Sequence, residues 1–337
     1  MKNPGKMRVA IIGTGGIAST HADAVRHSSM LQLCGCYNRT AKRGKEFAMK
    51  YDIPYYSSVN ELLEKASPEI VVNALAPHLH LLGLEEAAAK GCHLIVEKPL
   101  ARSMKECRDI IALAERWHVR LAVSESGRFN AVNRSFTANR EKFGRTLHIL
   151  ETNYRYYFNE ARFTGKWGVD PVEGVGGMLL NVGVHRIAKM RMLAGSEESS
   201  VTALAGCRKP EIPVEGDASF LIRYKNGAAG LLQMCGYFPT PNVANVSTVI
   251  TEKGYVNLAG KQEFSGMDGR VQPLDPDPMY DGPDYVNFYR VLERSFSGEA
   301  PFPGNAEEAM RDVAVILAAL KSQETERKVD LNEIFEE

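Results

Sequence analysis

Residues 8–18 read RVAIIGTGGIA, a short apolar run that passes directly into a glycine-rich segment. The segment Gly13–Ala18 fits the pattern G-x-G-x-x-A. In this pattern the first glycine permits a tight turn, the second lets a pyrophosphate approach the backbone, and the third small residue allows close helix–strand packing. A helix is expected from about Ile17 to Ser28, and its free N–H groups would face the phosphates. The stretch predicts a dinucleotide-binding loop with these cofactor contacts: Gly13, Thr14, Gly15, Gly16 and Ile17.

The sequence around this loop alternates between short apolar runs and helical patterns as far as about residue 124. Further buried strands are expected at 31–37, 69–74, 92–96 and 119–123. Strands that lack polar alternation and are separated by helices are typical of a parallel sheet covered on both faces. We therefore predict a Rossmann domain over residues 1–124.

The pattern changes after about residue 125. Longer strands are expected at 146–158, 200–207, 218–225, 228–237 and 245–251, with one long helix at about 176–193. They predict an α/β protein whose second domain, residues 125–337, has an open, largely antiparallel sheet. A final helix at about 306–322 carries apolar residues on one face and could pack back on the first domain. The length of 337 residues agrees with two domains.

Composition narrows the class of partner. Lys+Arg and Asp+Glu are both 41, so the formal net charge is zero and nothing favours binding to nucleic acid or to an anionic membrane. No apolar run approaches the roughly 20 residues that cross a bilayer, and no signal peptide is visible, so we expect a cytoplasmic protein. The six cysteines lack metal-site spacing, and we expect reduced thiols and no metal.

The end of the second strand bears on the choice of cofactor. An Asp or Glu there would bind the ribose hydroxyls of NAD and repel a 2′-phosphate. The chain instead has Asn38 followed by Arg39, with Lys42 and Arg43 nearby. A guanidinium beside a neutral residue suits a 2′-phosphate, so we predict NADP in preference to NAD. In the alternative, Arg39 only stacks on adenine and the basic residues form a solvated helix face.

Further motifs follow in order along the chain. They are Glu97-Lys98-Pro99 at the end of a Rossmann strand, Gly127-Arg128-Phe129-Asn130 at the domain boundary, GGMLLNVGVH at 176–185 and RKVDL at 327–331. Together with the glycine loop, they make the chain resemble the glucose–fructose oxidoreductase/inositol dehydrogenase/MocA (Gfo/Idh/MocA) family over nearly its whole length. The resemblance implies a Rossmann domain joined to an open-sheet α/β domain, and a homodimer or homotetramer.

The family's usual chemistry is hydride transfer between nicotinamide and a sugar, polyol or keto-sugar. The resemblance therefore implies a carbohydrate-like substrate. It also implies cofactor contacts beyond the glycine loop, which are Asn38, Arg39, Ala76, His80, Glu97, Lys98 and Arg128. For His80, capping of a helix is an equally good interpretation.

Two residues of these motifs suit proton transfer. Lys98 follows a strand, at the edge where open α/β sheets bind ligands, and its ammonium can polarise a reacting oxygen. His185 can exchange a proton near neutral pH, as general acid in reduction and as base in oxidation. Asn181 lies four residues earlier, on the same face of the expected helix. We expect Lys98 and His185 to converge over the nicotinamide ring.

Asn181 stands where the family more often has Asp. An amide keeps hydrogen bonds but holds no charge, so it cannot increase the basicity of His185 as a carboxylate would. We interpret Asn181 as a residue that positions the substrate hydroxyl or His185. Further substrate contacts are predicted at Arg155 and Trp167, although an ion pair and core packing explain these two residues equally well.

Two other functions stay open at this point. One is a regulator that binds the dinucleotide without turning it over, which the retention of Lys98 and His185 disfavours. The other is a glycoside hydrolase that uses bound NAD in a transient oxidation. Fold alone does not decide among these functions.

Overall fold

The computed structural model describes residues 5–158, 169–173, 177–208, 212–237 and 245–337. The chain divides into two compact units. The first unit comprises Met1–Ala101, Lys105–Ser126 and Gly282–Ala309, and the second comprises Arg102–Met104, Gly127–Asp281 and Met310–Glu337. The first unit therefore combines N-terminal residues with a segment from near the other end of the chain.

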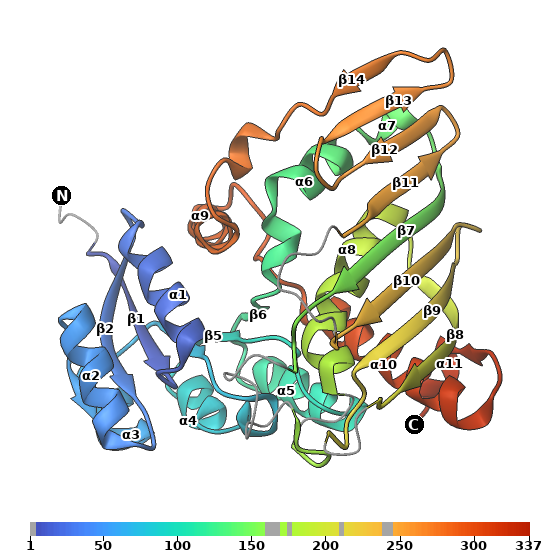
Figure 1. Ribbon diagram of the computed structural model, residues 1–337. Coiled ribbons are helices and arrows are strands. Elements are labelled where there is room, and N and C mark those ends of the chain that lie inside the picture. Colours follow the sequence, from blue (N-terminus) through green and yellow to red (C-terminus); the bar gives the residue numbers. More distant parts are fainter. Residues whose placement is uncertain (1–4, 159–168, 174–176, 209–211, 238–244) are drawn as a thin grey trace. The chain divides into compact units, whose positions relative to one another are not determined.

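The first unit contains a six-stranded parallel sheet in the order β3-β2-β1-β4-β5-β6 (Figure 1). The strands are β1 (Met7–Ile12), β2 (Leu31–Tyr37), β3 (Tyr55–Tyr56), β4 (Ile70–Asn73), β5 (His93–Val96) and β6 (Leu121–Val123). Every residue of β4 and the last four of β1 are buried, because helices cover both faces of the sheet. Strand order and burial confirm the predicted Rossmann sheet.

Two neighbouring residues of β2 show how the helices divide between these faces. The thiol of Cys36 donates to a carbonyl of α2, whereas a side chain at Gly35 would meet Leu62 of α3. Because successive residues of a strand point to opposite faces, α2 and α3 lie on opposite faces. The hydroxyl of Tyr51 in α2 donates to the carbonyl of Ser19 in α1, so α1 and α2 share a face. The helices of this region are α1 (Gly16–Arg26), α2 (Ala41–Tyr51), α3 (Val59–Ala66), η1 (Pro77–Leu79), α4 (Leu84–Ala89), α5 (Met104–Arg116) and η2 (Ser126–Phe129).

The late segment of the first unit carries α9 (Asp284–Phe296). The hydroxyl of Tyr289 lies 2.8 Å from Nδ1 of His21, which joins α9 to α1. Further along, the N–H of Val123 in β6 donates to the carbonyl of Gly304 at 2.8 Å. The segment thus contacts both the helix of the glycine loop and the last strand of the sheet.

The second unit is built on a nine-stranded sheet in the order β14-β13-β12-β11-β7-β10-β9-β8-β15 (Figure 1). Its strands are β7 (Thr146–Tyr154), β8 (Glu198–Gly206), β9 (Asp217–Tyr224), β10 (Ala229–Cys235), β11 (Ser247–Thr251), β12 (Gly254–Asn257), β13 (Glu263–Gly266), β14 (Val271–Pro273) and β15 (Val329–Asp330). Among the described strands of this sheet, β7 and β10 pair in parallel and the other neighbours are antiparallel. The open, largely antiparallel sheet that we expected is confirmed.

Helices cover one face of this sheet. A side chain at Gly183 would meet Ile316 of α10 and Met234 of β10, so the start of α8 lies between another helix and the sheet. Phe220, Leu232 and other inward residues are fully buried beneath these helices. The helices are α6 (Ala131–Ala138), α7 (Arg140–Phe143), η4 (Leu179–Gly183), α8 (Val184–Ala194), η5 (Pro278–Tyr280), α10 (Ala306–Thr325) and α11 (Leu331–Phe335). From Met310 onward, α10 belongs to the second unit.

The long helix expected at about 176–193 differs from a regular α-helix. Leu179–Gly183 form a π-helical turn, and the α-helix proper runs from Val184 to Ala194. Periodicity of apolar residues cannot reveal such a turn, because one wide turn changes the hydrogen-bond pattern while the surrounding helix keeps its buried face. π-Helical turns inside α-helices are frequent at functional sites.

Candidate active site

The glycine loop leaves space where a phosphate would bind. Gly13 has φ +90°, and a Cβ there would come 2.8 Å from Cδ2 of Leu75 and 2.9 Å from the carbonyl oxygen of Ala74. Only glycine fits this turn. At Gly15 and Gly16 the situation is the reverse, because a Cβ would meet no atom of the described residues within 4 Å.

Polar groups of the loop point to an anionic ligand. Gly15 is the N-cap of α1 and supplies no side-chain cap to the first N–H groups of that helix. The Oγ1 atom of Thr14 is buried and lacks a hydrogen-bond partner in the described part of the chain. Uncapped helix N–H groups, a buried hydroxyl and open space above two glycines fit the pyrophosphate of a dinucleotide. Ala18, completely buried, permits the close helix packing that the pattern predicts.

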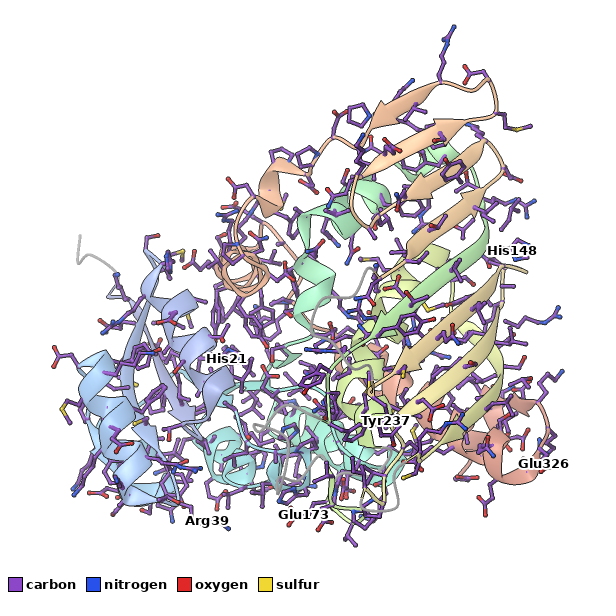
Figure 2. The ribbon with its side chains drawn as sticks, in the orientation of Figure 1. His21, Arg39, His148, Glu173, Tyr237 and Glu326 are labelled. Atoms are coloured by element: carbon purple, nitrogen blue, oxygen red, sulfur yellow. The ribbon has the colours of Figure 1, made fainter. Side chains whose placement is uncertain are left out.

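Asn38 connects the end of β2 to the glycine loop. Its Oδ1 accepts the N–H of Thr14 at 3.3 Å, and its Nδ2 donates to the carbonyl of Thr40 at 3.0 Å. Arg39, next along the chain, is exposed and forms no ion pair with any described residue (Figure 2). Lys42 and Arg43 at the start of α2 are also exposed. This edge of the first unit is therefore cationic.

The side chain of His80 contacts both loops that follow β4 and β5. Its ring is buried, with Nδ1 2.9 Å from the carbonyl of Leu100 and Nε2 3.1 Å from the carbonyl of Leu75. Burial lowers the pKa of His80, although both carbonyl contacts oppose this shift. His80 is also the C-cap of η1, whose N-cap is the partly exposed Ala76.

Glu97 and Lys98 directly follow β5. Glu97 is buried, with 3% of its surface exposed, whereas Lys98 is half-buried. The N–H of Lys98 donates to Oε2 of Glu97 at 3.2 Å, and the Lys98–Pro99 peptide bond is cis. Lys98 is thus at the carboxyl end of a central parallel strand, as the sequence predicts.

In the second unit, Asn181 lies in the π-helical turn and His185 in the first turn of α8. Both side chains are partly exposed. Nδ2 of Asn181 donates to the hydroxyl of Tyr157 at 2.7 Å, and Tyr157 is fully buried. The one signal of Tyr157 in the sequence is a tyrosine-rich run directly after a strand, but aromatic residues in such a place are most often core residues.

Two other residues of α8, Arg186 and Lys189, contact a buried carboxylate. Nζ of Lys189 lies 3.1 and 3.0 Å from the two oxygens of Glu151 and 2.6 Å from Oγ of Ser247. Arg186 contacts the same carboxylate at 2.9 Å. Burial lowers the pKa of Lys189, and the charge of Glu151 opposes this shift. This ion cluster fixes α8, which carries His185, to β7 and β11.

The other predicted contacts are Arg128, Arg155 and Trp167. Arg128 has a side chain that is 16% exposed, with NH2 3.5 Å from Oδ2 of Asp312. Arg155 follows β7 and donates its backbone N–H to the carbonyl of Cys235 at 2.8 Å. Trp167 lies outside the described residues. Arg128 therefore lies in the second unit, near the buried carboxylate of Asp312.

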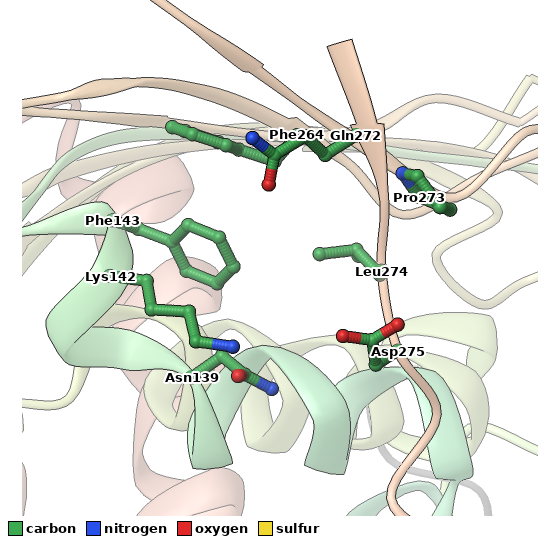
Figure 3. Close-up of a pocket in the computed structure, with 8 residues that line it drawn as sticks. All are labelled: Asn139, Lys142, Phe143, Phe264, Gln272, Pro273, Leu274 and Asp275. Carbon is green, nitrogen blue, oxygen red and sulfur yellow. The ribbon is translucent and has the colours of Figure 1, made fainter.

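A groove of about 370 Å³ opens elsewhere in the second unit (Figure 3). Phe143 and Lys142 of α7 face Leu274 and Asp275 across it. The complete lining is Asn139, Lys142, Phe143, Phe264, Gln272, Pro273, Leu274 and Asp275. None of the predicted site residues lines this groove, so it is separate from the candidate site.

Thiols and acidic side chains form no metal centre in the part of the chain described. All six cysteines are free, and burial raises the pKa of Cys36 and of Cys107 to about 12, which makes these thiols unreactive. Among the described residues, no three His, Cys, Asp or Glu side chains are grouped so that they could hold a metal ion. In the same residues, no helix has both the length and the apolar character required to span a membrane.

Known proteins resemble this chain both in overall sequence and in fold. It is 22% identical over 336 residues to the scyllo-inositol 2-dehydrogenase (NADP(+)) IolU of Bacillus subtilis, an alignment that covers 93% of this chain and 99% of that protein. The structure of an oxidoreductase from Agrobacterium radiobacter in complex with NAD+, L-tartaric acid and magnesium superimposes with a TM-score of 0.85, at 19% identity over 97% of this chain and 99% of that one. An aldose–aldose oxidoreductase from Caulobacter crescentus, complexed with glycerol, gives a TM-score of 0.83 at 21% identity, over 96% and 99% of the two chains.

Two matches to family profiles extend over most of the chain. Residues 7–125 match an oxidoreductase family with an NAD-binding Rossmann fold, named Gfo/Idh/MocA. Residues 139–257 match the C-terminal domain of the same family. The glycine loop and Lys98 fall within the first match, and strands β7 to β12 of the second unit fall within the second. The chain therefore belongs to the Gfo/Idh/MocA family of oxidoreductases and has its NAD(P)-binding Rossmann fold.

Proposed function

We propose that the protein transfers a hydride between a nicotinamide cofactor and the carbinol or carbonyl carbon of a sugar, polyol or keto-sugar. The position of Lys98 carries this proposal, because the residue lies two positions after the end of β5, in the same unit as the open glycine loop. Open α/β sheets bind ligands at the carboxyl ends of their strands. The relative from B. subtilis is named as an inositol dehydrogenase, which supports a polyhydroxylated substrate.

Each residue of the proposed site has a distinct task. When bound, the nicotinamide supplies or accepts the hydride. Lys98 donates a hydrogen bond from its ammonium to the substrate oxygen and stabilises the negative charge that develops there in reduction. His185 gives that oxygen its proton in reduction and removes it in oxidation. Asn181 orients the substrate hydroxyl or His185 through its amide.

We assign the binding of cofactor and substrate to further residues. The pyrophosphate lies against the loop from Gly13 to Ile17, and Asn38 and Arg39 hold the adenosine ribose. The remaining cofactor contacts in this proposal are Ala76, His80, Glu97, Lys98 and Arg128. Arg155, Trp167, Asn181 and His185 are the proposed substrate contacts.

The proposed preference for NADP rests on the charges after β2. Asn38 is neutral and already donates to a backbone carbonyl, so it would not repel a 2′-phosphate. Arg39, Lys42 and Arg43 are exposed cations without ion pairs among the described residues, and they can form charge-assisted hydrogen bonds with that phosphate.

We also propose that the protein is a homo-oligomer, a dimer or tetramer formed through the open face of the nine-stranded sheet. Leu231 pairs with Leu221 on one side and with Leu150 on the other, and these side chains are 39%, 60% and 38% exposed. Ile250 and Tyr255 form another exposed pair on the same sheet. Contiguous exposed apolar surface marks an interface, and a second copy of the same face suits two-fold symmetry.

A substrate screen tests the proposed reaction. The purified protein is incubated with NADP+ or NAD+ and a panel of sugars and polyols, and with NADPH or NADH and keto-sugars, while absorbance at the nicotinamide band is recorded. We expect turnover with at least one member and faster rates with the phosphorylated cofactor. Tight cofactor binding without turnover on the whole panel would favour a regulator instead, and cofactor that remains bound and redox-cycles without net absorbance change would favour a hydrolase.

A further inference from the structure

One buried carboxylate in the first unit accepts hydrogen bonds from four directions. Oε1 of Glu97 lies 2.8 Å from Nε2 of His21, and it accepts the hydroxyl of Ser124 at 2.7 Å and the hydroxyl of Tyr285 at 2.8 Å. Oε2 receives the N–H of Lys98 at 3.2 Å. The backbone N–H of Lys98 can only donate, and the imidazole and the two hydroxyls can each donate as well, so a carboxylate can accept at all four contacts. The surroundings therefore suit the ionised form of Glu97.

The charge of Glu97 persists although the group is buried. Burial raises the pKa of Glu97, but the hydrogen bond and charge of His21, the charge of Lys98 and the hydroxyl of Ser124 together lower it to about 2. An ionised group without such partners would be costly in this environment. His21 is the strongest of these partners, and its side chain is completely buried.

His21 itself connects three parts of the first unit. It lies in α1, the helix whose N-terminus forms the glycine loop (Figure 2). Its Nε2 contacts Glu97 after β5, and its Nδ1 contacts the hydroxyl of Tyr289 in α9 at 2.8 Å. Because an ionised carboxylate can only accept, the contact with Glu97 requires a proton on Nε2 of His21.

We propose that His21 is a positioning residue for Lys98, acting through Glu97. By holding Glu97 ionised and in one position, His21 gives Lys98 a constant anionic neighbour. The ammonium of Lys98 can then interact with Glu97 and with the substrate oxygen at the same time. The same contact sets the distance between the helix of the glycine loop and the strand that carries Lys98. This inference rests on the proposed function, in which Lys98 contacts the substrate.

The first test follows the carboxyl group of Glu97 and needs no turnover. In protein labelled with ¹³C at the glutamate carboxyls, the Glu97 signal is assigned by its loss in Glu97→Gln. We expect it to remain at the ionised position from about pH 5 to 8 in the parent protein and to titrate within that range in His21→Leu, because burial then dominates. His21→Gln restores an N–H donor and should return the signal to the ionised position. A Glu97 signal that stays ionised in His21→Leu overturns the proposal.

The second test uses turnover with a substrate from the screen. His21→Leu should lower kcat by about tenfold at pH 6, with less loss at pH 8 and little change in cofactor Kd. His21→Gln should recover most of kcat. Val25→Ala, at an equally buried site of α1, is the control for a merely structural effect and should lower Tm without a new acid limb in the pH profile. The same acid limb in Val25→Ala, or no limb in His21→Leu, overturns the positioning role. If no substrate is found for the parent protein, the proposed function fails while the carboxyl signal still decides whether His21 keeps Glu97 ionised.

Discussion

Nδ2 of Asn181 donates a hydrogen bond to the hydroxyl oxygen of Tyr157, 2.7 Å away. Because Tyr157 is fully buried, this contact fixes the orientation of the amide. It also uses the capacity of Asn181 to donate, which a carboxylate at the same position would lack. The hydroxyl of Tyr157 can also donate, so an aspartate at position 181 could keep the contact by accepting from it while adding a charge.

The first prediction concerns this pair. Asn181→Asp should move the acid limb of the oxidation pH–rate profile to higher pH, because a negative charge one helical turn from His185 favours the protonated imidazole. Tyr157→Phe should lower the free energy of unfolding by about 1 kcal/mol and leave the profile in place. Initial rates between pH 5 and 10 and thermal melts give both values. An unmoved profile in Asn181→Asp would mean that residue 181 is not coupled to His185.

The second prediction concerns Lys98. Lys98→Ala should lower kcat by roughly 100-fold or more, since the developing oxyanion loses its charged donor, while the Kd of the cofactor changes little. Lys98→Arg keeps the charge and should retain part of the activity. If Lys98 and His185 act in the same chemical step, the double variant Lys98→Ala/His185→Ala should raise the activation free energy by much less than the sum of the increases in the two single variants. Additive losses would assign them to separate steps.

The third prediction separates folding from binding within the glycine loop. Gly15→Ala places a methyl group in open space at φ −75°, so the variant should keep its Tm while losing at least about tenfold in cofactor affinity. Gly13→Ala forces a side chain against Ala74 and Leu75 at positive φ and should also lower the free energy of unfolding by about 1–3 kcal/mol. Thermal melts and cofactor titration distinguish the two. Equal loss of Tm in both variants would contradict the structure of the loop.

The fourth prediction concerns cofactor choice. Arg39→Asp should reduce the ratio of kcat/KM for NADP+ to that for NAD+ by about 10- to 100-fold, because it removes a charge-assisted hydrogen bond and adds repulsion. Lys261→Asp makes the same change of charge at an exposed position of the second unit and serves as the control. An unchanged ratio in Arg39→Asp would leave adenine stacking as the role of Arg39.

The fifth prediction concerns assembly. Leu221→Asp places a charge in the middle of the exposed leucine row and should convert the oligomer to a smaller species, because burial of an unpaired carboxylate in an apolar interface is unfavourable. Met267→Asp, 83% exposed in the turn after β13, should leave the mass unchanged. Light scattering after size exclusion gives the masses. A monomeric parent protein would refute the proposed interface.

Much of the fold could be predicted from sequence because its signals are local. The apolar runs of the first sheet, the glycines of the loop and the alternating strands of the second sheet each occupy a few consecutive residues. The change from buried to alternating strands also separated the two kinds of sheet. Lys98 could be placed at the end of β5 for the same reason.

Features that depend on distant residues could not be predicted. The contact of His21 with Tyr289 joins residues 268 positions apart, and nothing near either residue encodes the other. The π-helical turn at Asn181 leaves the apolar pattern of its helix intact. Tyr157 was missed because a tyrosine that follows a strand is ordinarily a core residue, and only the structure shows that its hydroxyl contacts Asn181.

The participation of residues 282–309 in the first unit has a consequence for biosynthesis. A backbone N–H of β6 donates to the carbonyl of Gly304, and α9 contacts α1. On the ribosome, the N-terminal Rossmann sheet therefore emerges long before the chain that completes it, and the intervening second-unit residues must be synthesised first. An exposed, unfinished nucleotide-binding half is the form that chaperones would meet during translation.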